Sequence, residues 1–191
     1  MSSKEKILRA AIVLFAQKGY SGLSMRQLAL AVDLSVAAIY HHFPDKNALY
    51  LDAVRFSFSD KEQVFDQIWN SDFTAKEKLH SFIRSFIDVM LNDRDFHRLM
   101  QREILEADPE RMQLLAQGVF NSQFCLLMQL MTELAPEQDA HLLATSAIGL
   151  AKYYIEYQPL LKNLPGWKPE HEIPEFIAAR VTTLLLNSFQ A

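Results

Sequence analysis

Side chains that could perform catalysis or hold a metal are few in this sequence, and none of them completes a site. Glu77 and His80 form one E-x-x-H pair, but a helical di-iron site needs two such pairs and further glutamates. Asp93, Asp95 and His97 could touch a metal, yet Asp at the start of a helix more often acts as a cap. We therefore predict no catalytic residues, no metal site and no cofactor.

The common catalytic motifs are also missing. Cys125 lies in an apolar stretch with no basic neighbour in sequence, which favours a small core residue over a nucleophile. There is no glycine-rich phosphate loop and no H-E-x-x-H motif. One cysteine cannot make an internal disulfide, and the start, MSSKEKILRA, lacks the apolar segment of a secretory signal. These features predict a cytoplasmic protein that is not an enzyme.

Another set of residues has chemistry suited to phosphate. Ser24 and Ser35 each stand where a helix is expected to begin, and a helix N-terminus offers free amide hydrogens and a positive dipole end to an anion. Arg26, in the first turn after Ser24, could reach a phosphate or the edge of a guanine. Capping alone is the alternative for the serines, and a solvated charge is the alternative for Arg26.

The distribution of charge favours one small face for nucleic acid. The whole chain has a net charge of −4, but residues 1–50 contain six Lys and Arg against three acids, whereas the remainder contains 13 against 20. A basic head on an acidic body can present one surface to phosphate and keep the rest away from it. Chance segregation of the charges is the alternative.

Helices are the elements that must position these residues. Only five glycines, and long stretches rich in Ala, Leu, Met, Gln, Glu and Lys, favour helix over strand, so the predicted fold class is all-α. Capping residues, glycines and prolines predict where the helices begin and end. Helices are expected from Ser2 to Gly19, from Ser24 to Val32, from Ser35 to before Pro44, and over 46–70, 75–92, 95–107, 109–132, 136–158 and 174–189, with an irregular segment at 159–174.

The two short helices lie next to each other in sequence and are joined by a tight turn at Asp33 and Leu34. Ser24 and Gln27 have the spacing of a capping box, and Ser35 supplies a further N-cap. Two short helices joined in this way form a helix-turn-helix, whose second helix enters the major groove of DNA.

Three segments in this order carry a family resemblance: LF-x-x-KGY at 14–20, S-x-R-x-LA at 24–29 and S-x-x-x-IYHHF-x-x-K at 35–46. Over roughly residues 3–54 the chain resembles the DNA-binding domain of TetR-family repressors. It departs from the family at the turn, where Val32-Asp33 replaces the usual Ala-Gly. Because Asp tolerates a positive φ better than most residues, we expect the turn to survive.

The resemblance implies which residues meet DNA. Lys46 is similar to the family's phosphate-contacting lysine. Val36, Ala37 and Ala38 open the recognition helix and could make only apolar contacts with thymine methyls, so base readout falls to polar neighbours and to DNA shape. Ile39 is expected to pack in the core, as is Phe43. The predicted DNA-binding residues are Ser24, Arg26, Gln27, Ser35, Val36, Ala37, Ala38, Tyr40, His41, His42 and Lys46.

The stretch Met112 to Thr132 contains no ionisable acid or base. A membrane span is one reading, but six Gln, Asn and Ser side chains would be costly in lipid, so no membrane is expected and we interpret the stretch as a helix surrounded by others. Neutral polar and soft apolar residues recur along it, as in a ligand pocket, with core packing as the alternative. The predicted effector-binding residues are Phe86, Met90, Met100, Glu103, Ile104, Gln117, Asn121, Phe124, Met128, Tyr153 and Tyr157.

The family resemblance also implies two domains and a homodimer. We expect a helix-turn-helix domain with its connecting helix at 2–62, and a helical domain for effector binding and dimerisation at 63–191. The last two long helices would pair with those of a partner through the stripes Ala140, Ala144, Ala147, Ala151 and Ile177, Val181, Leu184, Leu185; an intramolecular core is the alternative.

The predicted function is sequence-specific binding of double-stranded operator DNA by a transcriptional regulator. It would be a repressor that a small, mainly apolar or aromatic effector releases from DNA. The alternative is a protein-binding adaptor of the same fold that does not bind DNA, because the recognition helix has few polar groups at its start.

Overall fold

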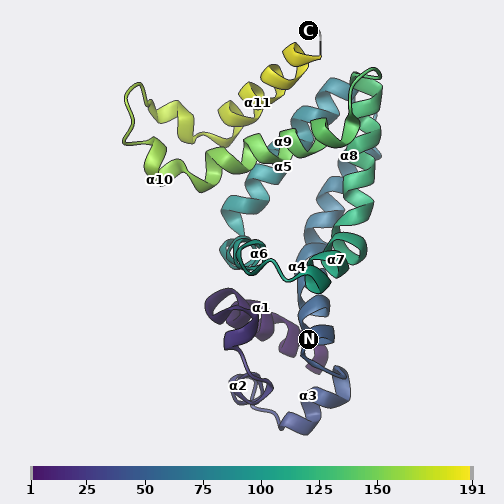
Figure 1. Cartoon of the computed structure of the whole chain (residues 1–191), viewed down its shortest axis with the longest axis vertical. Coiled ribbons are helices and arrows are strands. Elements are labelled where there is room, and N and C mark those ends of the chain that lie inside the picture. Colours follow the sequence, from purple (N-terminus) through teal and green to yellow (C-terminus); the bar gives the residue numbers. More distant parts are fainter. Residues whose placement is uncertain (1, 190–191) are drawn as a thin grey trace. The chain divides into compact units, whose positions relative to one another are not determined.

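The computed structural model describes residues 2–189, except for the side chain of residue 60. All regular elements in this range are helical, which confirms the predicted all-α class (Figure 1). The last two residues of the predicted second domain lie outside the described range. The elements are α1 (Ser3–Gly22), α2 (Met25–Ala31), α3 (Val36–His42), α4 (Lys46–Trp69), α5 (Ala75–Asn92), α6 (Arg94–Glu106), α7 (Pro109–Leu115), the π-helix η1 (Ala116–Phe120), α8 (Asn121–Leu134), α9 (Ala140–Glu156), α10 (Gln158–Leu161), the 3₁₀ helix η2 (Pro169–Glu172) and α11 (Pro174–Ser188).

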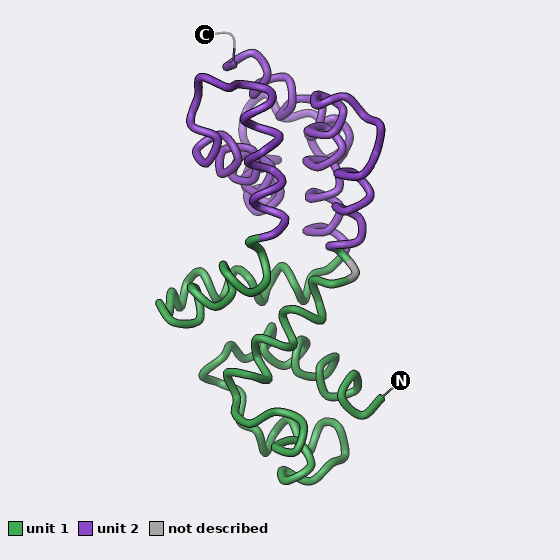
Figure 2. Tube along the Cα trace, turned by 90° about the vertical axis from the view of Figure 1, so that its right-hand side faces the viewer, with its two compact units in different colours: residues 1–61, 93–121 green, residues 62–92, 122–191 purple. Residues whose placement is uncertain are grey.

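The helices form two compact units that do not follow chain order (Figure 2). Unit 1 contains residues 1–61 and 93–121, and unit 2 contains residues 62–92 and 122–191. The N-terminal helices therefore share a unit with α6, α7 and η1, whose residues belong to the second domain predicted from the sequence. The functional boundary at 62 stays a prediction.

Unit 1 is built around α1, which packs along α6 and against α2. Its core is formed by the apolar faces of these helices and of α3 and α4, including Ile7, Phe15, Leu28, Ile39 and Leu49, none of which is exposed. The predicted burial of Ile39 is confirmed, as is that of Phe43. Packing of these apolar faces stabilises the short helices α2 and α3, which would not be stable as isolated helices.

Local capping determines where the first three helices begin. Ser2 and Glu5 form a capping box, and so do Ser24 and Gln27. In each box the serine hydroxyl accepts from the backbone amide of the later residue, whose side chain accepts from the backbone amide of the serine. The Ser35 hydroxyl accepts from the amide of Ala38 at 3.1 Å. All three caps agree with the sequence prediction.

Positive φ angles occur at the two breaks expected from the sequence. Gly19 has φ 74° and ψ 172° and interrupts α1, which resumes for one further turn to Gly22. Asp33, in the turn between α2 and α3, has φ 55°, which Asp adopts more readily than most side chains. The unusual Val32-Asp33 pair thus accommodates the turn.

Unit 2 is a helical bundle in which α5 packs against α9 and α11, and these two pack against each other. The stripe Ala144, Ala147 and Ala151 is fully buried at these contacts, so it serves the core of one chain. On α11, Ile177 is buried in the same way, as are Val181 and Leu185, whereas Leu184 is exposed. The intramolecular alternative therefore holds for most of both stripes.

The uncharged segment is one continuous helical stretch, α7, η1 and α8, with a π-helical turn in its middle. By length and composition alone, Pro109–Leu134 could cross a membrane, and 33% of its most apolar window is buried in the described structure. The prediction that other helices surround it is wrong. Its exposed side carries neutral polar side chains such as Gln113, Gln117 and Ser122, which can form hydrogen bonds with water although they are uncharged.

The predicted helix at 136–158 begins four residues late. Pro136 lies in a turn, and the Asp139 carboxylate accepts the amide of Leu142 at 3.1 Å and caps α9. The segment predicted to be irregular, 159–174, contains the short helices α10 and η2.

Candidate nucleic-acid interface

The predicted DNA-binding residues lie on α2, α3 and their caps, and at the first turn of α4. Within unit 1 these two short helices lie side by side, and they pack on each other (Figure 1). Eight of the eleven residues are exposed, and Val36, Ala38 and Lys46 are half-buried. The exposed ones are Ser24, Arg26, Gln27, Ser35, Ala37, Tyr40, His41 and His42. The fold thus presents one polar, accessible surface.

The recognition helix is anchored from behind. Ile39 and Phe43 are buried, and the backbone amide of Phe43 closes the helix by donating to the carbonyl of Ile39. At the start of α3 the amide of Ala38 is bonded to the Ser35 hydroxyl, and the neighbouring residues Val36 and Ala37 have small side chains. A backbone or a groove wall can therefore approach this end closely.

Lys46 is held by an aromatic ring. Its Nζ lies 4.3 Å from the centroid of the Tyr20 ring, a cation–π distance, and the Tyr20 hydroxyl donates to Asn47. Burial, and then the nearby charge of Arg111, lower the pKa of Lys46. An incoming phosphate would offset both effects by supplying a negative charge.

A buried ionic cluster lies behind this lysine. Glu103 on α6 is 2% exposed and Arg111 on α7 is 7% exposed. Arg111 Nε donates to Glu103 Oε1 at 3.0 Å, and the Tyr50 hydroxyl donates to Glu103 Oε2 at 2.7 Å. Arg111 Nη2 also donates to Glu106 at 2.9 Å. Both buried charges are therefore paired and hydrogen-bonded, as burial requires.

The Tyr20 ring connects Lys46 with this cluster. Arg111 Cζ lies 4.1 Å from the ring centroid, so Tyr20 contacts two cations. Tyr50 packs edge-on against the same ring, with centroids 5.4 Å apart. Burial, and then the hydrogen bond to Glu103, raise the pKa of Tyr50, so its hydroxyl stays protonated and keeps donating.

Sequence reasoning did not find this cluster. The sequence predicts Glu103 only as an effector-binding residue and does not mark Arg111, Tyr50 and Tyr20 as a group. The available signal was Tyr20 in the KGY segment, Tyr50 on the connecting helix, and Arg111 directly after the acidic residues Glu106, Asp108 and Glu110. Nothing in the sequence places these residues side by side.

The predicted effector-binding residues are divided between the two units. Unit 1 contains Met100, Glu103, Ile104, Gln117 and Asn121, whereas unit 2 contains Phe86, Met90, Phe124, Met128, Tyr153 and Tyr157. Within unit 2, Tyr153 and Tyr157 stack with centroids 4.7 Å apart, and Phe124 meets His141 edge-on at 5.2 Å. Their assignment to an effector stays a prediction.

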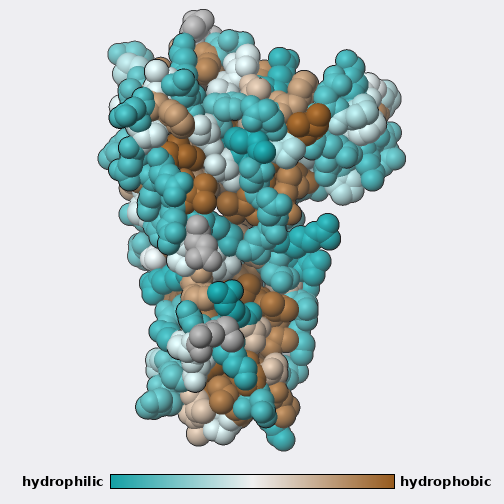
Figure 3. All heavy atoms as spheres, turned by 180° about the vertical axis from the view of Figure 1, so that it is seen from behind, coloured by the Kyte–Doolittle hydropathy of each residue, from teal (hydrophilic) through white to brown (hydrophobic). Residues whose placement is uncertain are grey.

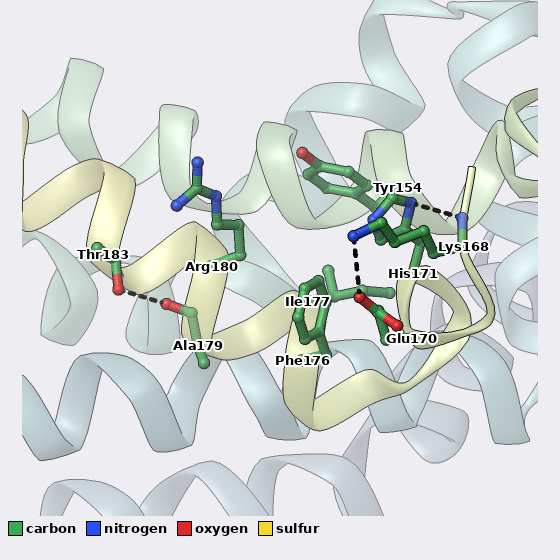
Figure 4. A pocket seen from close by; sticks show the side chains of 9 residues that line it. All are labelled: Tyr154, Lys168, Glu170, His171, Phe176, Ile177, Ala179, Arg180 and Thr183. Atoms are coloured by element: carbon green, nitrogen blue, oxygen red, sulfur yellow. Dashed lines mark hydrogen bonds and ion pairs between the residues drawn. The ribbon is translucent and has the colours of Figure 1, made fainter. Parts of the chain in front are cut away.

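Unit 2 also has a cavity of about 520 Å³ that none of these residues lines. Figure 4 shows Tyr154 on α9 and Arg180 on α11 facing it, with Lys168 and His171 from the segment between the two helices. Lys168 pairs with Glu170 at 3.7 Å, and its backbone amide donates to His171. The lining combines aromatic and cationic groups.

Exposed apolar side chains interrupt the hydrophilic surface, as Figure 3 shows for one face of the molecule. On α9 the exposed residues Leu142, Gly149 and Tyr153 recur at helical spacing, which the C-cap residue Tyr157 continues, and a Cβ added at Gly149 would meet nothing within 4 Å. On α11, Phe176 and Leu184 are exposed. These two helices therefore bury one side in unit 2 and leave another apolar side uncovered.

The residues considered for metal or catalytic chemistry have other roles in the structure. His80 Nε2 lies 2.9 Å from Glu175 Oε1, and the Asp93 carboxylate caps α6. Cys125 is exposed, so its prediction as a core residue is wrong. Within residues 2–189, no group of three His, Cys, Asp or Glu could hold a metal ion.

Two family models match the chain. Residues 7–53 match "Bacterial regulatory proteins, tetR family", and residues 75–190 match "HTH-type transcriptional dual regulator CecR, C-terminal domain". The matches cover the helix-turn-helix and most of the remaining helices respectively.

Curated relatives and solved structures are similar to parts or all of the chain. The biofilm operon negative transcriptional regulator IcaR of Staphylococcus aureus (strain Newman) is 31% identical over 84 residues, 44% of this chain and 45% of that protein. "Probable HTH-type transcriptional regulator YttP" of Bacillus subtilis (strain 168) is 29% identical over 106 residues, 54% of this chain and 51% of that protein. The chain thus spans about half the length of these relatives. FadR from Bacillus subtilis, solved with stearoyl-CoA, has a TM-score of 0.76 at 18% identity, covering 95% of this chain and 97% of that one, and shares the fold.

Proposed function

Because this chain belongs to the TetR family of bacterial transcriptional regulators, we propose that it binds operator DNA specifically and represses transcription until an effector releases it. The observation that carries the proposal is the exposed face of α2 and α3, with its serine caps and with Lys46 at the start of α4. Serine-capped N-termini and a lysine suit phosphate, and the polar side chains suit base edges.

The chemistry of each side chain indicates whether it contacts bases or the sugar-phosphate backbone. Ala37 is exposed and can approach a thymine methyl, whereas Arg26 and Gln27 on α2 have groups that form paired hydrogen bonds with guanine and adenine. Tyr40 and His42 on α3 are also exposed and suit the sugar-phosphate backbone. Few base contacts per protomer favour two protomers on a palindromic site, with DNA shape contributing to specificity.

A binding assay tests the proposal. The purified full-length chain is titrated with the DNA upstream of its own gene, and with a duplex that it selects from a randomised pool, at two salt concentrations with excess competitor. We expect preferred binding that weakens steeply with salt, since each phosphate contact contributes about −0.9 to the slope of log K against log salt. A folded protein without any preference over competitor would contradict the proposal.

We propose that the effector is mainly apolar or aromatic. Its supports are the aromatic and methionine side chains of Phe86, Met90, Phe124 and Met128 on α5 and α8, and the stearoyl-CoA bound to the structural neighbour FadR. The readout is release of the selected duplex in a screen of apolar and aromatic compounds. A compound that releases the duplex should raise the Tm of the protein, because ligands stabilise the state that they bind.

We propose further that the chain acts as a homodimer through the uncovered sides of α9 and α11. The support is the exposed apolar spacing from Leu142 to Tyr157, with Gly149 open to close approach of another helix. A twofold pair of these sides would bury apolar area without disturbing the buried alanine stripe. The oligomeric state in solution is the measurement that decides it.

A further inference from the structure

We propose that Arg111, fixed by Glu103, is a positioning residue for DNA binding: through the Tyr20 ring it sets the place of Lys46 and couples α6 and α7 to the helix-turn-helix. This inference rests on the proposed function, because Lys46 matters only if the chain binds DNA. The whole cluster lies in unit 1.

Arg111 is held more firmly than a surface arginine. Glu103 accepts from its Nε at 3.0 and 3.3 Å, Glu106 accepts from Nη2 at 2.9 Å, and Asp108 lies 3.5 Å from Nη1. Glu103 is itself held by the Tyr50 hydroxyl on α4. Such a planar guanidinium with several fixed acceptors has little freedom to turn.

The guanidinium of Arg111 also lies against an aromatic ring. Arg111 lies 4.1 Å from the Tyr20 centroid and 6.0 Å from that of Tyr50. Lys46 Nζ lies 4.3 Å from the Tyr20 centroid. The position of Lys46 therefore depends on a ring whose own position depends on Arg111.

The same end of α6 is attached to α1 by separate contacts. Arg102 donates from Nε to the carbonyl of Ala16 and from Nη2 to that of Gln17, both at 2.9 Å. These carbonyls lie just before the break at Gly19, which leads into Tyr20. A displacement of α6 would thus move both the end of α1 and the Arg111 site, and with them Tyr20 and Lys46.

The experiment compares the wild-type chain with the double variant Glu103→Met/Arg111→Met, each with Lys46 intact and with Lys46→Ala. Replacing both charges by apolar residues of similar length avoids an unpaired buried charge and should preserve the fold, which circular dichroism and Tm check. With Lys46 intact we expect the double variant to lose about tenfold in affinity for the selected duplex, and with Lys46→Ala to lose little, since coupled residues are not additive.

A matched control removes an arginine that pairs with acids elsewhere. Arg84 in unit 2 contacts Asp88 and Glu175. Arg84→Met should leave the affinity for the duplex within about twofold, because it deletes one positive charge without touching Tyr20.

A direct measurement separates the positioning claim from the function. In full-length protein labelled with ¹³C-lysine, the ε-methylene protons of Lys46 should show an upfield ring-current shift from Tyr20, and the shift should disappear in the double variant. Tyr20→Phe should keep the shift and Tyr20→Leu should remove it, without altering the ion pair.

The outcomes are distinct. An unchanged Lys46 shift in the double variant, or equal losses of affinity with and without Lys46, would overturn the inference. A wild-type chain that shows the shift but no preference for any duplex would overturn the proposed function and, with it, the role of the cluster in DNA binding.

Discussion

Arg111 in unit 1 shows how one buried charge can affect the stability of the fold. Its charge is buried beside Glu103, which is 2% exposed. A buried pair adds little to stability as a pair, but removing one partner leaves the other charge unpaired in a medium that solvates it poorly. Removing one partner should therefore lower the stability of the fold more than removing both.

Arg111→Met alone is expected to lower the free energy of unfolding by about 3–5 kcal/mol, because Glu103 is left buried without its cation. The double variant with Glu103→Met should recover most of that loss. Urea unfolding of the three proteins measures both values. Equal instability of the single and double variants would show that packing of the arginine stem, and not its charge, is what matters.

Tyr50 makes stability sensitive to alkaline pH. Its folded-state pKa is raised above the ordinary value of 10.0, first by burial and then by its bond to Glu103. Below pH 10 both states keep the proton and stability is unaffected. Above pH 10 the unfolded state ionises and the folded state does not, so stability falls by up to about 1.4 kcal/mol per pH unit.

Urea unfolding between pH 9 and 11 tests this expectation. Tyr50→Phe cannot ionise, so its stability should fall less steeply over that range than that of the wild-type chain. Parallel decreases in the two proteins would assign the alkaline loss to other groups.

Among the elements, α1 depends on its break at Gly19. Gly19 has φ 74° and ψ 172°, a region that glycine alone occupies readily, and an added Cβ would lie 2.8 Å from Glu106 Oε1. Gly19→Ala should therefore cost about 1–3 kcal/mol. Gly22, where a Cβ would meet only Lys18 at 3.4 Å, is the control, and Gly22→Ala should be neutral or stabilising by about 0.5–1 kcal/mol.

Tm values for the two alanine variants decide the point, since both remove a glycine from the same helix. A loss at Gly22 as large as that at Gly19 would mean that flexibility of the segment, and not the backbone angle at one residue, accounts for the effect.

Arg26 on α2 and Lys46 at the start of α4 are expected to contribute mainly specificity and mainly affinity, respectively. Arg26→Ala on α2 should cost about 1–3 kcal/mol on the selected duplex and relax preference at one base pair, whereas Lys46→Ala should weaken all duplexes alike and reduce the salt slope by about one per protomer. Titrations on matched and single-mismatch duplexes at several salt concentrations distinguish the two patterns. The same pattern for both variants would contradict the assignment.

Sequence reasoning succeeded at this scale wherever the interactions are local. The capping boxes join residues three positions apart, and the turn at Asp33 depends on the backbone preference of one residue. The cluster behind Lys46 joins Tyr50 and Glu103, 53 positions apart, through the packing of three helices. Periodicity specifies which side of a helix is apolar, but it does not specify which helix covers it.

At the scale of the whole molecule, the uncovered sides of α9 and α11 matter most. The alanine stripe looked suitable for a partner, but small residues allow close approach equally well inside one chain, where Ala144 and Ala147 are fully buried. The uncharged helix was misjudged for a related reason, since neutral amides such as Gln117 can face water.

The proposed dimer interface lies on the exposed sides of α9 and α11, and charged substitutions there test it. Leu142→Glu and Leu184→Glu should each shift the protein from dimer to monomer in analytical ultracentrifugation and reduce affinity for a palindromic duplex, because a buried charge opposes association. Leu105→Glu is the control: Leu105 on α6 is 84% exposed and lies outside these helices. Dissociation by all three variants, or by none, would contradict an interface on α9 and α11.

The π-helical turn at Ala116–Phe120 has a consequence for how this chain compares with its relatives. A π turn accommodates one residue more than an α turn, so it absorbs an extra residue that would otherwise rotate the rest of the helix by about 100°. A homologue with a single deletion there would carry a regular helix, and the side chains of α8 would still face the same directions. A gap of one position in an alignment at this segment therefore leaves the inward-facing residues of α8 the same and marks only the loss of the wide turn.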